Sequence, residues 1–266
     1  MKNQKDLLYG EAEIKYKNIH RLFSNLLEKI IELREDFMIS NITLYQSLNG
    51  TNDWNPENED LIVYLKQCIN MGAWDSIEEI IELDIIVDLL FDWLEDCVKY
   101  VINPKKILKL SMIRGFDSNL AAFVSTHTSG VSIDKKLRRD IIDFIKFHFN
   151  ACELETLITI SQFLALIHPS KESNEEHNEF LLVVDRLSRL LLGFNIQDLN
   201  DITSINCLNV ERLKKIICLT VYVIINDLEE IEDEDNFFSI GDNSNQSHNS
   251  SFFLRFTNKM SDTKDV

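Results

Sequence analysis

The feature that most constrains the fold of this chain is the scarcity of residues that interrupt helices. Only seven glycines and three prolines occur in 266 residues, well below the usual share of both types. Long stretches between them carry apolar residues three and four positions apart, the spacing that gives an α-helix one apolar face. The sequence therefore predicts an all-α protein whose helices are joined by short connections.

The apolar spacing and the few interruptions place the expected helices along the chain. The first is expected over about residues 7–37 and is followed by a polar stretch, 47–58, with the composition of a turn region. Asparagine–proline pairs at 55–56 and 103–104 indicate helix starts, because asparagine caps a helix N-terminus and proline suits the first helical position. Further helical segments are expected over 61–69, 74–83, 85–98, 120–125, 134–150, 154–167, 179–192 and 210–228.

Composition divides the chain into three parts. Residues 1–54 are expected to form an N-terminal helical extension, and residues 55–232 a single helical domain. Residues 227–235 hold seven acidic side chains, and a serine- and asparagine-rich run follows over 239–251. Such segments bury too little apolar surface to offset the loss of chain entropy, so residues 233–266 are expected to form a disordered tail. Its phenylalanine-rich segment could dock on a partner, but a tail without a function is the favoured interpretation.

Charge and hydropathy limit the expected partners and compartment. The chain has 44 acidic and 27 basic residues and a net charge of −17. A protein that binds nucleic acid through its phosphates needs a basic surface, so nucleic acid is not an expected partner. The basic group Lys135, Lys136, Arg138 and Arg139 is interpreted as the solvated side of a helix. No apolar run approaches the roughly 18 residues of a membrane span, and the charged N-terminal residues do not fit a secretory signal peptide.

The cysteines indicate the redox environment. There are five of them, at positions 68, 97, 152, 207 and 218, and none has C-x-x-C spacing. An odd number of unpaired cysteines in apolar, helix-like surroundings is typical of reduced thiols in a cytosolic protein. They are therefore expected to be core thiols of a soluble cytoplasmic protein.

Motifs that carry chemistry are missing from the sequence. Phosphate-binding loops need closely spaced glycines, and the closest pair here is Gly115 and Gly130. None of the cysteines is followed six positions later by the arginine that a cysteine phosphatase needs. His148 and Cys152 would share a helical face, but two ligands without a second pair favour a buried histidine and a core cysteine over zinc. No catalytic, cofactor-binding or metal site is therefore expected.

Two segments carry a resemblance to a known family. Residues 72–75 read Gly-Ala-Trp-Asp, and residues 87–95 read Val-Asp-Leu-Leu-Phe-Asp-Trp-Leu-Glu. With the apolar positions of 157–167 and 216–225, they resemble a RhoGAP domain over roughly residues 58–230. The resemblance implies a single RhoGAP-like helical bundle after the N-terminal extension, and it places a small GTPase among the expected partners.

The functional residues of that family are replaced in this chain. By the resemblance, the arginine finger falls at Asp75. The helix lysine and helix arginine fall at Phe91 and Glu95, and the central-helix asparagine falls at Glu153. Because a cation must stabilise the charge on a transferring phosphoryl group, the resemblance implies the fold without GTPase-activating chemistry. Arg114 could replace the finger, but a solvated loop arginine is the favoured interpretation.

A more specific resemblance is carried by six residues of these segments: Gly72, Ala73, Trp74, Trp93, Leu94 and Glu95. Asp75, at the position expected for the arginine finger, directly follows Trp74. It resembles the helical region that follows the catalytic domain in protein tyrosine phosphatase domain-containing proteins. This resemblance implies a cytoskeletal or ciliary partner and a location at the cilium, centrosome or cytoskeleton. A phosphatase half is not expected within this sequence, because residues 1–54 are too short for it and no cysteine loop occurs. The resemblance leaves two alternatives open: a stand-alone relative, or the C-terminal part of a larger phosphatase. Both tryptophans are interpreted first as core residues.

Three functions remain open from the sequence. The first is a non-catalytic protein-interaction or signalling domain, whose acidity favours a basic partner surface through electrostatic steering. The second is an active GTPase-activating protein that uses Arg114. The third is a helical-repeat scaffold, which the lack of a fixed period of about 30–45 residues disfavours.

Overall fold

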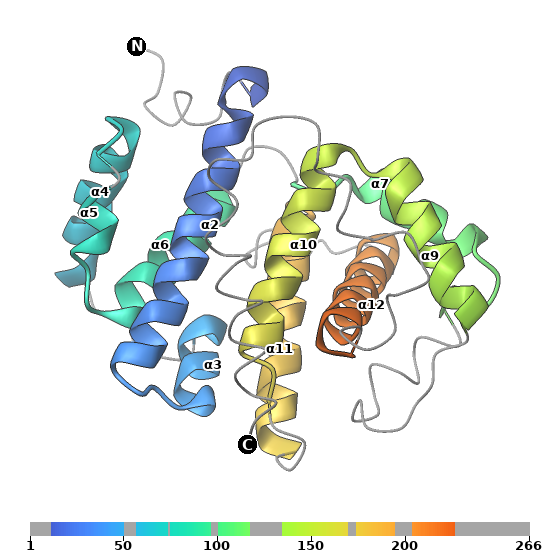
Figure 1. Ribbon diagram of the computed structural model, residues 1–266. Helices are drawn as coiled ribbons and strands as arrows, with labels where there is room; N and C mark the ends of the chain where they lie inside the picture. Colours follow the sequence, from blue (N-terminus) through green and yellow to red (C-terminus); the bar gives the residue numbers. More distant parts are fainter. Residues whose placement is uncertain are drawn as a thin grey trace.

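Regular structure in this chain is helical wherever the structure describes it (Figure 1). The computed structural model describes residues 12–50, 57–73, 75–96, 101–117, 135–169, 174–194 and 204–226. No β-strand occurs within these ranges, which confirms the expected all-α class. The elements are α2 Ala12–Asp36, α3 Asn41–Asn49, α4 Glu57–Asn70, α5 Asp75–Glu78, α6 Leu83–Asp96, α7 Pro104–Leu108, the short 3-10 helix η1 Lys109–Met112, α9 Lys135–His148, α10 Ala151–Leu166, α11 Asn174–Leu191 and α12 Ser204–Asn226.

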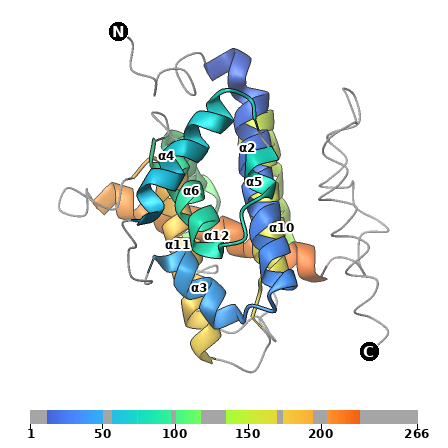
Figure 2. The same cartoon turned by 90° about the vertical axis from the view of Figure 1, so that its left-hand side faces the viewer.

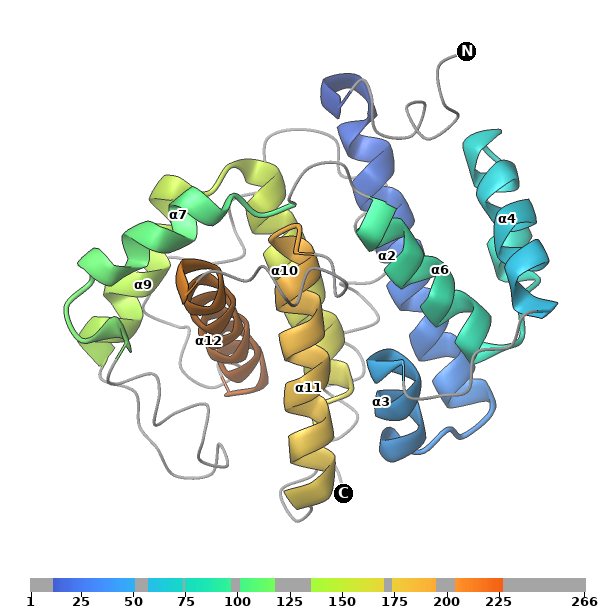
Figure 3. The same cartoon turned by 180° about the vertical axis from the view of Figure 1, so that it is seen from behind.

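The main helix pairs join elements that are far apart in the chain. Helix α2 packs against α6, α3 packs against α11, and α12 packs against both α10 and α11. Helix α2 also lies beside α10 (Figure 2). Helices α4 and α5 lie at one end of the molecule, and α7 and α9 lie at the opposite end (Figure 1, Figure 3). Because each repeat of a solenoid packs mainly on its sequence neighbours, this arrangement disfavours the helical-repeat alternative.

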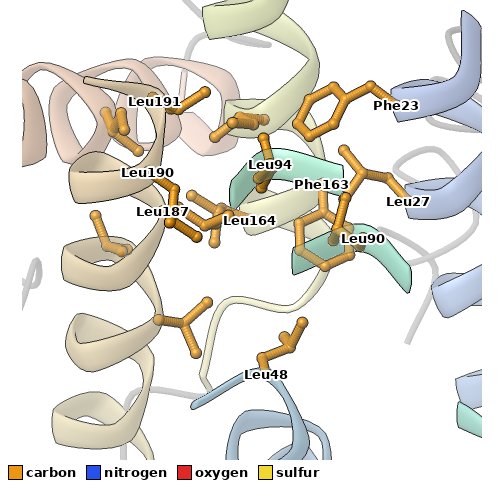
Figure 4. Packing of buried hydrophobic residues seen from close by; sticks show 14 of the residues in the cluster. Phe23, Leu27, Leu48, Leu90, Leu94, Phe163, Leu164, Leu187, Leu190 and Leu191 are labelled. Carbon is orange, nitrogen blue, oxygen red and sulfur yellow. The ribbon is translucent and has the colours of Figure 1, made fainter. Parts of the chain in front are cut away.

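One hydrophobic core connects these helices. Figure 4 shows its centre, where Phe23 of α2 and Leu90 and Leu94 of α6 lie close to Phe163 of α10. Leu187 of α11 approaches the same region from the other side. All five side chains are at most 3% exposed. Removal of this apolar surface from water is therefore the main force that holds the four helices together.

The helices that precede residue 54 contribute to this core. The hydroxyl of Tyr45 in α3 donates a hydrogen bond to the Ile167 carbonyl at the end of α10, and burial is the largest cause of the raised pKa of Tyr45. The amide of Asn49 donates to the Glu179 carboxylate of α11 at 2.9 Å. The described parts of the predicted extension and of the predicted domain therefore share one core. The predicted boundary itself falls within residues 51–56, which lie outside the described residues.

The prediction is wrong over helix α3. It placed a turn region over 47–58, which includes the last residues of α3, and it placed no helix over the first residues of α3. The hydroxyl of Ser40 caps the helix by accepting a hydrogen bond from the Thr43 N–H at 3.2 Å. Gly50 ends it with a φ of +68°, a left-handed conformation that glycine adopts without steric cost. Leu44 and Leu48 are buried, and the helix packs mainly against α11. Such a short helix depends on packing against a partner remote in sequence, which apolar spacing does not reveal.

Replacing Gly50 by alanine is expected to lower the free energy of unfolding by about 2 kcal/mol. A Cβ atom there would lie 2.9 Å from Nη1 of Arg186, which donates a 2.7 Å hydrogen bond to the Leu48 carbonyl. The left-handed backbone costs alanine about 1 kcal/mol, and disturbing the arginine hydrogen bond adds about 1 kcal/mol. Chemical denaturation measures the change.

Gly72→Ala is the matched control for this prediction. Gly72 also has a positive φ, +84°, but no atom lies within 4 Å of its Cβ position. This variant is expected to lose only about 1 kcal/mol, from the backbone alone. Equal losses in the two variants would show that Arg186 moves aside without cost.

The predicted helix start at the second asparagine–proline pair is confirmed. The side chain of Asn103 accepts a hydrogen bond from the Lys105 N–H at 3.0 Å, and Pro104 takes the first helical position of α7. Helix α10 begins at Ala151, before the predicted start at 154, because Asn150 forms a reciprocal capping box with the third residue of the helix. The first asparagine–proline pair lies outside the described residues.

Two further helices begin earlier than predicted. Helix α11 starts at Asn174 rather than at 179, and α12 starts at Ser204 rather than at 210. Their first turns are mostly polar or exposed, so they carry little of the apolar pattern on which the prediction rested. The predicted helix over 120–125 and the predicted disordered tail, 233–266, lie outside the described residues. None of the described helices combines the length and the apolar character that crossing a membrane requires.

Candidate interaction surface

The residues of the predicted family motif separate into a buried group and an exposed group. Trp93 and Leu94 of α6 are core residues, 4% and 2% exposed. The Trp93 ring centroid lies 5.6 Å from that of Phe23 in α2, so this part of the motif positions helices. Glu95, on the same helix, is exposed. Trp74 lies outside the described residues.

The exposed group of motif residues forms the turn between α4 and α5. The Gly72 N–H donates to the Ile69 carbonyl at 3.0 Å, and the Ala73 N–H donates to the Cys68 carbonyl at 2.9 Å. These bonds satisfy carbonyls at the end of α4, and the positive φ of Gly72 is what such a helix end requires. Asp75 follows as the exposed first residue of α5. The glycine therefore has a structural explanation, whereas the Asp75 side chain is open to a partner.

An exposed apolar stripe on α4 leads into this turn. Leu61, Tyr64 and Met71 are 37%, 58% and 76% exposed. Their spacing places Leu61 and Tyr64 on one side of the helix, and Met71 directly follows its last residue. The neighbouring side of α4 carries Ile62 and Leu65, which are buried against the rest of the protein. The apolar arc of α4 is thus wider than its packing partners cover, and the uncovered part forms a surface.

The stripe lies in the most acidic part of the described chain. Residues 57–96 contain twelve acidic side chains and one lysine, Lys66, which pairs with Asp92. Lys29 of α2 also reaches this end and donates to the Glu78 carbonyl at 2.8 Å. We call the following set the acidic surface: the apolar residues Leu61, Tyr64, Met71 and Ile81, with the exposed carboxylates of Asp60, Asp75, Glu78, Glu79 and Glu82.

A half-buried arginine of α11 fixes α6 against α3 and α11. The guanidinium of Arg186 in α11 lies 3.6 Å from the centroid of the Phe91 ring and donates to the Leu48 carbonyl at 2.7 Å. Burial lowers the pKa of Arg186. Burial and then the charge of Asp84 raise the pKa of Asp88 on α6. Because Arg186 is stacked and hydrogen-bonded, its role is packing.

Arg114, the alternative finger residue, is exposed and lies in the turn after η1. Arg212 of α12 holds this turn: its Nη2 donates to the Asp117 carboxylate at 2.8 Å and its Nε donates at 3.1 Å. This hydrogen-bonded contact with Arg212 holds the pKa of Asp117 below its usual range. The structure thus places Arg114 at the α7–α9 end, opposite to Asp75 at the α4–α5 end (Figure 1, Figure 3). It does not bring the two together.

The spacing argument for a metal pair at His148 and Cys152 is wrong. Helix α9 ends at His148, and Cys152 belongs to α10, so the two do not share one helical face. Both are half-buried rather than core residues, and the rings of Phe144 and Phe147 flank His148 with centroids at 4.3 and 5.0 Å. Burial raises the pKa of Cys152 to about 12, which disfavours the thiolate that zinc requires. Across the described ranges, no group of three or more metal-ligating side chains comes together.

The other cysteines only partly match the expectation of core thiols. Cys68 is buried, and burial raises the pKa of Cys218 to about 12. Cys207 is exposed in the first half of α12, which corrects the prediction for that residue. Cys97 lies outside the described residues. The described cysteines are all thiols without a disulfide partner.

Comparison with protein-family models, with curated proteins and with solved structures gave no match.

Proposed function

We propose that this chain is a non-catalytic protein-interaction domain whose acidic surface binds a basic, partly apolar surface of another protein. The observation that carries the proposal is the exposed stripe of Leu61, Tyr64 and Met71 within a segment that has twelve acidic residues and one lysine. Exposed apolar side chains rimmed by charge are typical of binding surfaces. The carboxylates would attract and orient a basic partner, and burial of the apolar stripe would supply affinity.

The placement of charged residues supports the non-catalytic part of the proposal. The side chain at the expected finger position is the exposed carboxylate of Asp75, which would repel a transferring phosphoryl group. Arg114 lies at the opposite end of the molecule from it, so no observation favours the alternative of an active GTPase-activating protein. The RhoGAP-like fold stays a prediction, as do a small GTPase or a cytoskeletal or ciliary protein as the partner.

A synthetic peptide provides the test. The probe is a fluorescently labelled amphipathic helix with leucine on one face and lysine on the other, and its anisotropy is followed on titration with the full chain. Tyr64→Ser combined with Met71→Ser is expected to weaken binding about tenfold, because two large apolar side chains no longer contribute to the contact. The reference is the unmodified chain at the same ionic strength.

The matched control keeps the charge and changes apolar residues elsewhere. Met38 at the end of α2 and Leu182 of α11 are 91% and 54% exposed, and Met38→Ser combined with Leu182→Ser is expected to leave the affinity unchanged. If both double variants bind the peptide as the unmodified chain does, the attraction is only that of net charge and the proposal fails.

A further inference from the structure

Charge in this molecule is segregated between two opposite ends. Against the acidic α4–α6 segment stand residues 101–117 and 135–148, which together contain nine lysines and arginines and three acidic residues. Helices α7 and α9, which these segments form, both lie at the end opposite to α4 and α5 (Figure 1, Figure 3). A chain with a net charge of −17 therefore carries a locally basic end.

Internal contacts hold Asp117, one of these three acidic residues, and also Glu153 of α10, which lies outside the two segments. Asp117 accepts two hydrogen bonds from Arg212, and the buried Glu153 accepts one from Lys106. Asp140 and Asp143 are the exposed acidic residues of α9. The surface that a partner would meet at this end is therefore dominated by cations.

The basic end also exposes large apolar side chains. Met112 at the end of η1 is 82% exposed and Phe147 of α9 is 84% exposed. We call the following set the basic surface: Met112 and Phe147, with the exposed cations Lys105, Lys109, Arg114 and Lys135. Both surfaces combine exposed apolar side chains with charged ones, which are negative on the acidic surface and positive on the basic surface.

We propose that the basic surface of one copy binds the acidic surface of a second copy, head to tail. The two surfaces are complementary in charge and in apolar character. The cations of one would contact the carboxylates of the other, and the apolar side chains of both would be buried together. The inference rests on the proposed function of the acidic surface and names a second copy of this chain as a partner. Because the acidic surface and the net charge repel an anionic membrane, a second copy fits the basic surface better than a lipid headgroup does.

The geometry sets the form of the assembly. The contact joins two different surfaces, so each added copy leaves one surface of each kind uncovered at the ends. Association therefore continues into short chains and does not stop at a symmetric dimer. Since exposed ion pairs are individually weak and are screened by salt, the contact is concentration-dependent and salt-sensitive.

Sedimentation velocity of the full chain over a concentration series tests the inference. At about 0.1 M NaCl the average mass is expected to rise with concentration, and at about 1 M it is expected to fall toward the monomer. Tyr64→Ser with Met71→Ser alters only the acidic surface, and Met112→Ser with Phe147→Ser alters only the basic surface. Each double variant is expected to self-associate about tenfold more weakly than the unmodified chain.

Mixing the two double variants gives the decisive result. Each retains the surface that the other has lost, so an equimolar mixture is expected to form a heterodimer of unmodified affinity that does not grow further. A chain that stays monomeric at every concentration, or a mixture that shows no heterodimer, would overturn the inference. So would a monomeric chain whose basic surface binds phosphatidylserine vesicles instead.

The peptide titration separates this inference from the proposed function. If the chain remains monomeric but binds the leucine–lysine peptide through Tyr64 and Met71, the head-to-tail contact fails and the proposed function stands. If peptide binding is insensitive to Tyr64 and Met71, the proposed function of the acidic surface fails, and the head-to-tail contact fails with it.

Discussion

Replacing Phe163 by alanine is expected to lower the free energy of unfolding by about 3–5 kcal/mol. Phe163 is fully buried in α10, and its ring lies where α2, α6 and α10 meet, close to Phe23, Leu27 and Leu90 (Figure 4). Removing the ring loses its transfer free energy and leaves a cavity that three rigid helices cannot close. Urea denaturation followed by circular dichroism measures the loss.

Two further variants keep this prediction informative. Phe163→Leu fills most of the site and is expected to lose about 1.5 kcal/mol or less, so it stays folded if the alanine variant does not. Phe147→Ala removes the same ring from a position that is 84% exposed and is expected to change stability by no more than about 0.5 kcal/mol. Similar losses from Phe147→Ala and Phe163→Ala would contradict the core described above.

Replacing Glu153 by alanine is expected to cost about 3–5 kcal/mol. Its carboxylate is 3% exposed and joins the starts of two helices. It pairs with Lys106 of α7 and accepts hydrogen bonds from the Asn103 N–H at 3.1 Å and the Asn150 N–H at 2.8 Å. Alanine would leave a partly buried ammonium and two backbone donors without their acceptor, and these desolvated groups account for the loss.

A double-mutant cycle tests the cause of that loss. Lys106→Met combined with Glu153→Ala is expected to be less unstable than the sum of the two single variants, because the uncompensated charge is removed. Lys66→Ala is the control at an exposed ion pair, because Lys66 pairs with the Asp92 side chain, which is 42% exposed. This variant is expected to lower the free energy of unfolding by about 1 kcal/mol or less. Additive losses at Lys106 and Glu153 would show that the buried pair is not coupled.

Local rules were sufficient for much of the helical framework. The asparagine–proline start of α7 and the core position of Trp93 follow from capping and apolar spacing, which act within a few residues. Helix α3 does not follow from local rules, because its buried face packs against α11 and α6, which are both remote in sequence. The expectation that His148 and Cys152 share a helical face is wrong, because the chain leaves α9 at His148 and a new helix begins after the cap at Asn150.

Less of the acidic surface than of the fold could be predicted from the sequence. The family motif includes Asp75 of the acidic surface, but it does not include Leu61 and Tyr64, which belong to the same surface. Apolar spacing gives the width of an apolar arc on a helix and not the part of it that neighbours cover. The wide arc of α4, in which exposed Leu61 adjoins buried Ile62, was the available signal. The role of Glu153 also depends on a contact with remote Lys106 and was not predictable from spacing.

Amide hydrogen exchange of the full chain, with and without the leucine–lysine peptide, tests the central claim most directly. The exchange of segment 59–82 is compared with that of α11 and α12, which contribute no residue to the acidic or the basic surface, under the same conditions. If the acidic surface is the binding surface, the peptide slows exchange in 59–82 and leaves α11 and α12 unchanged. Protection confined to other helices, or binding without any protection in 59–82, would contradict the account.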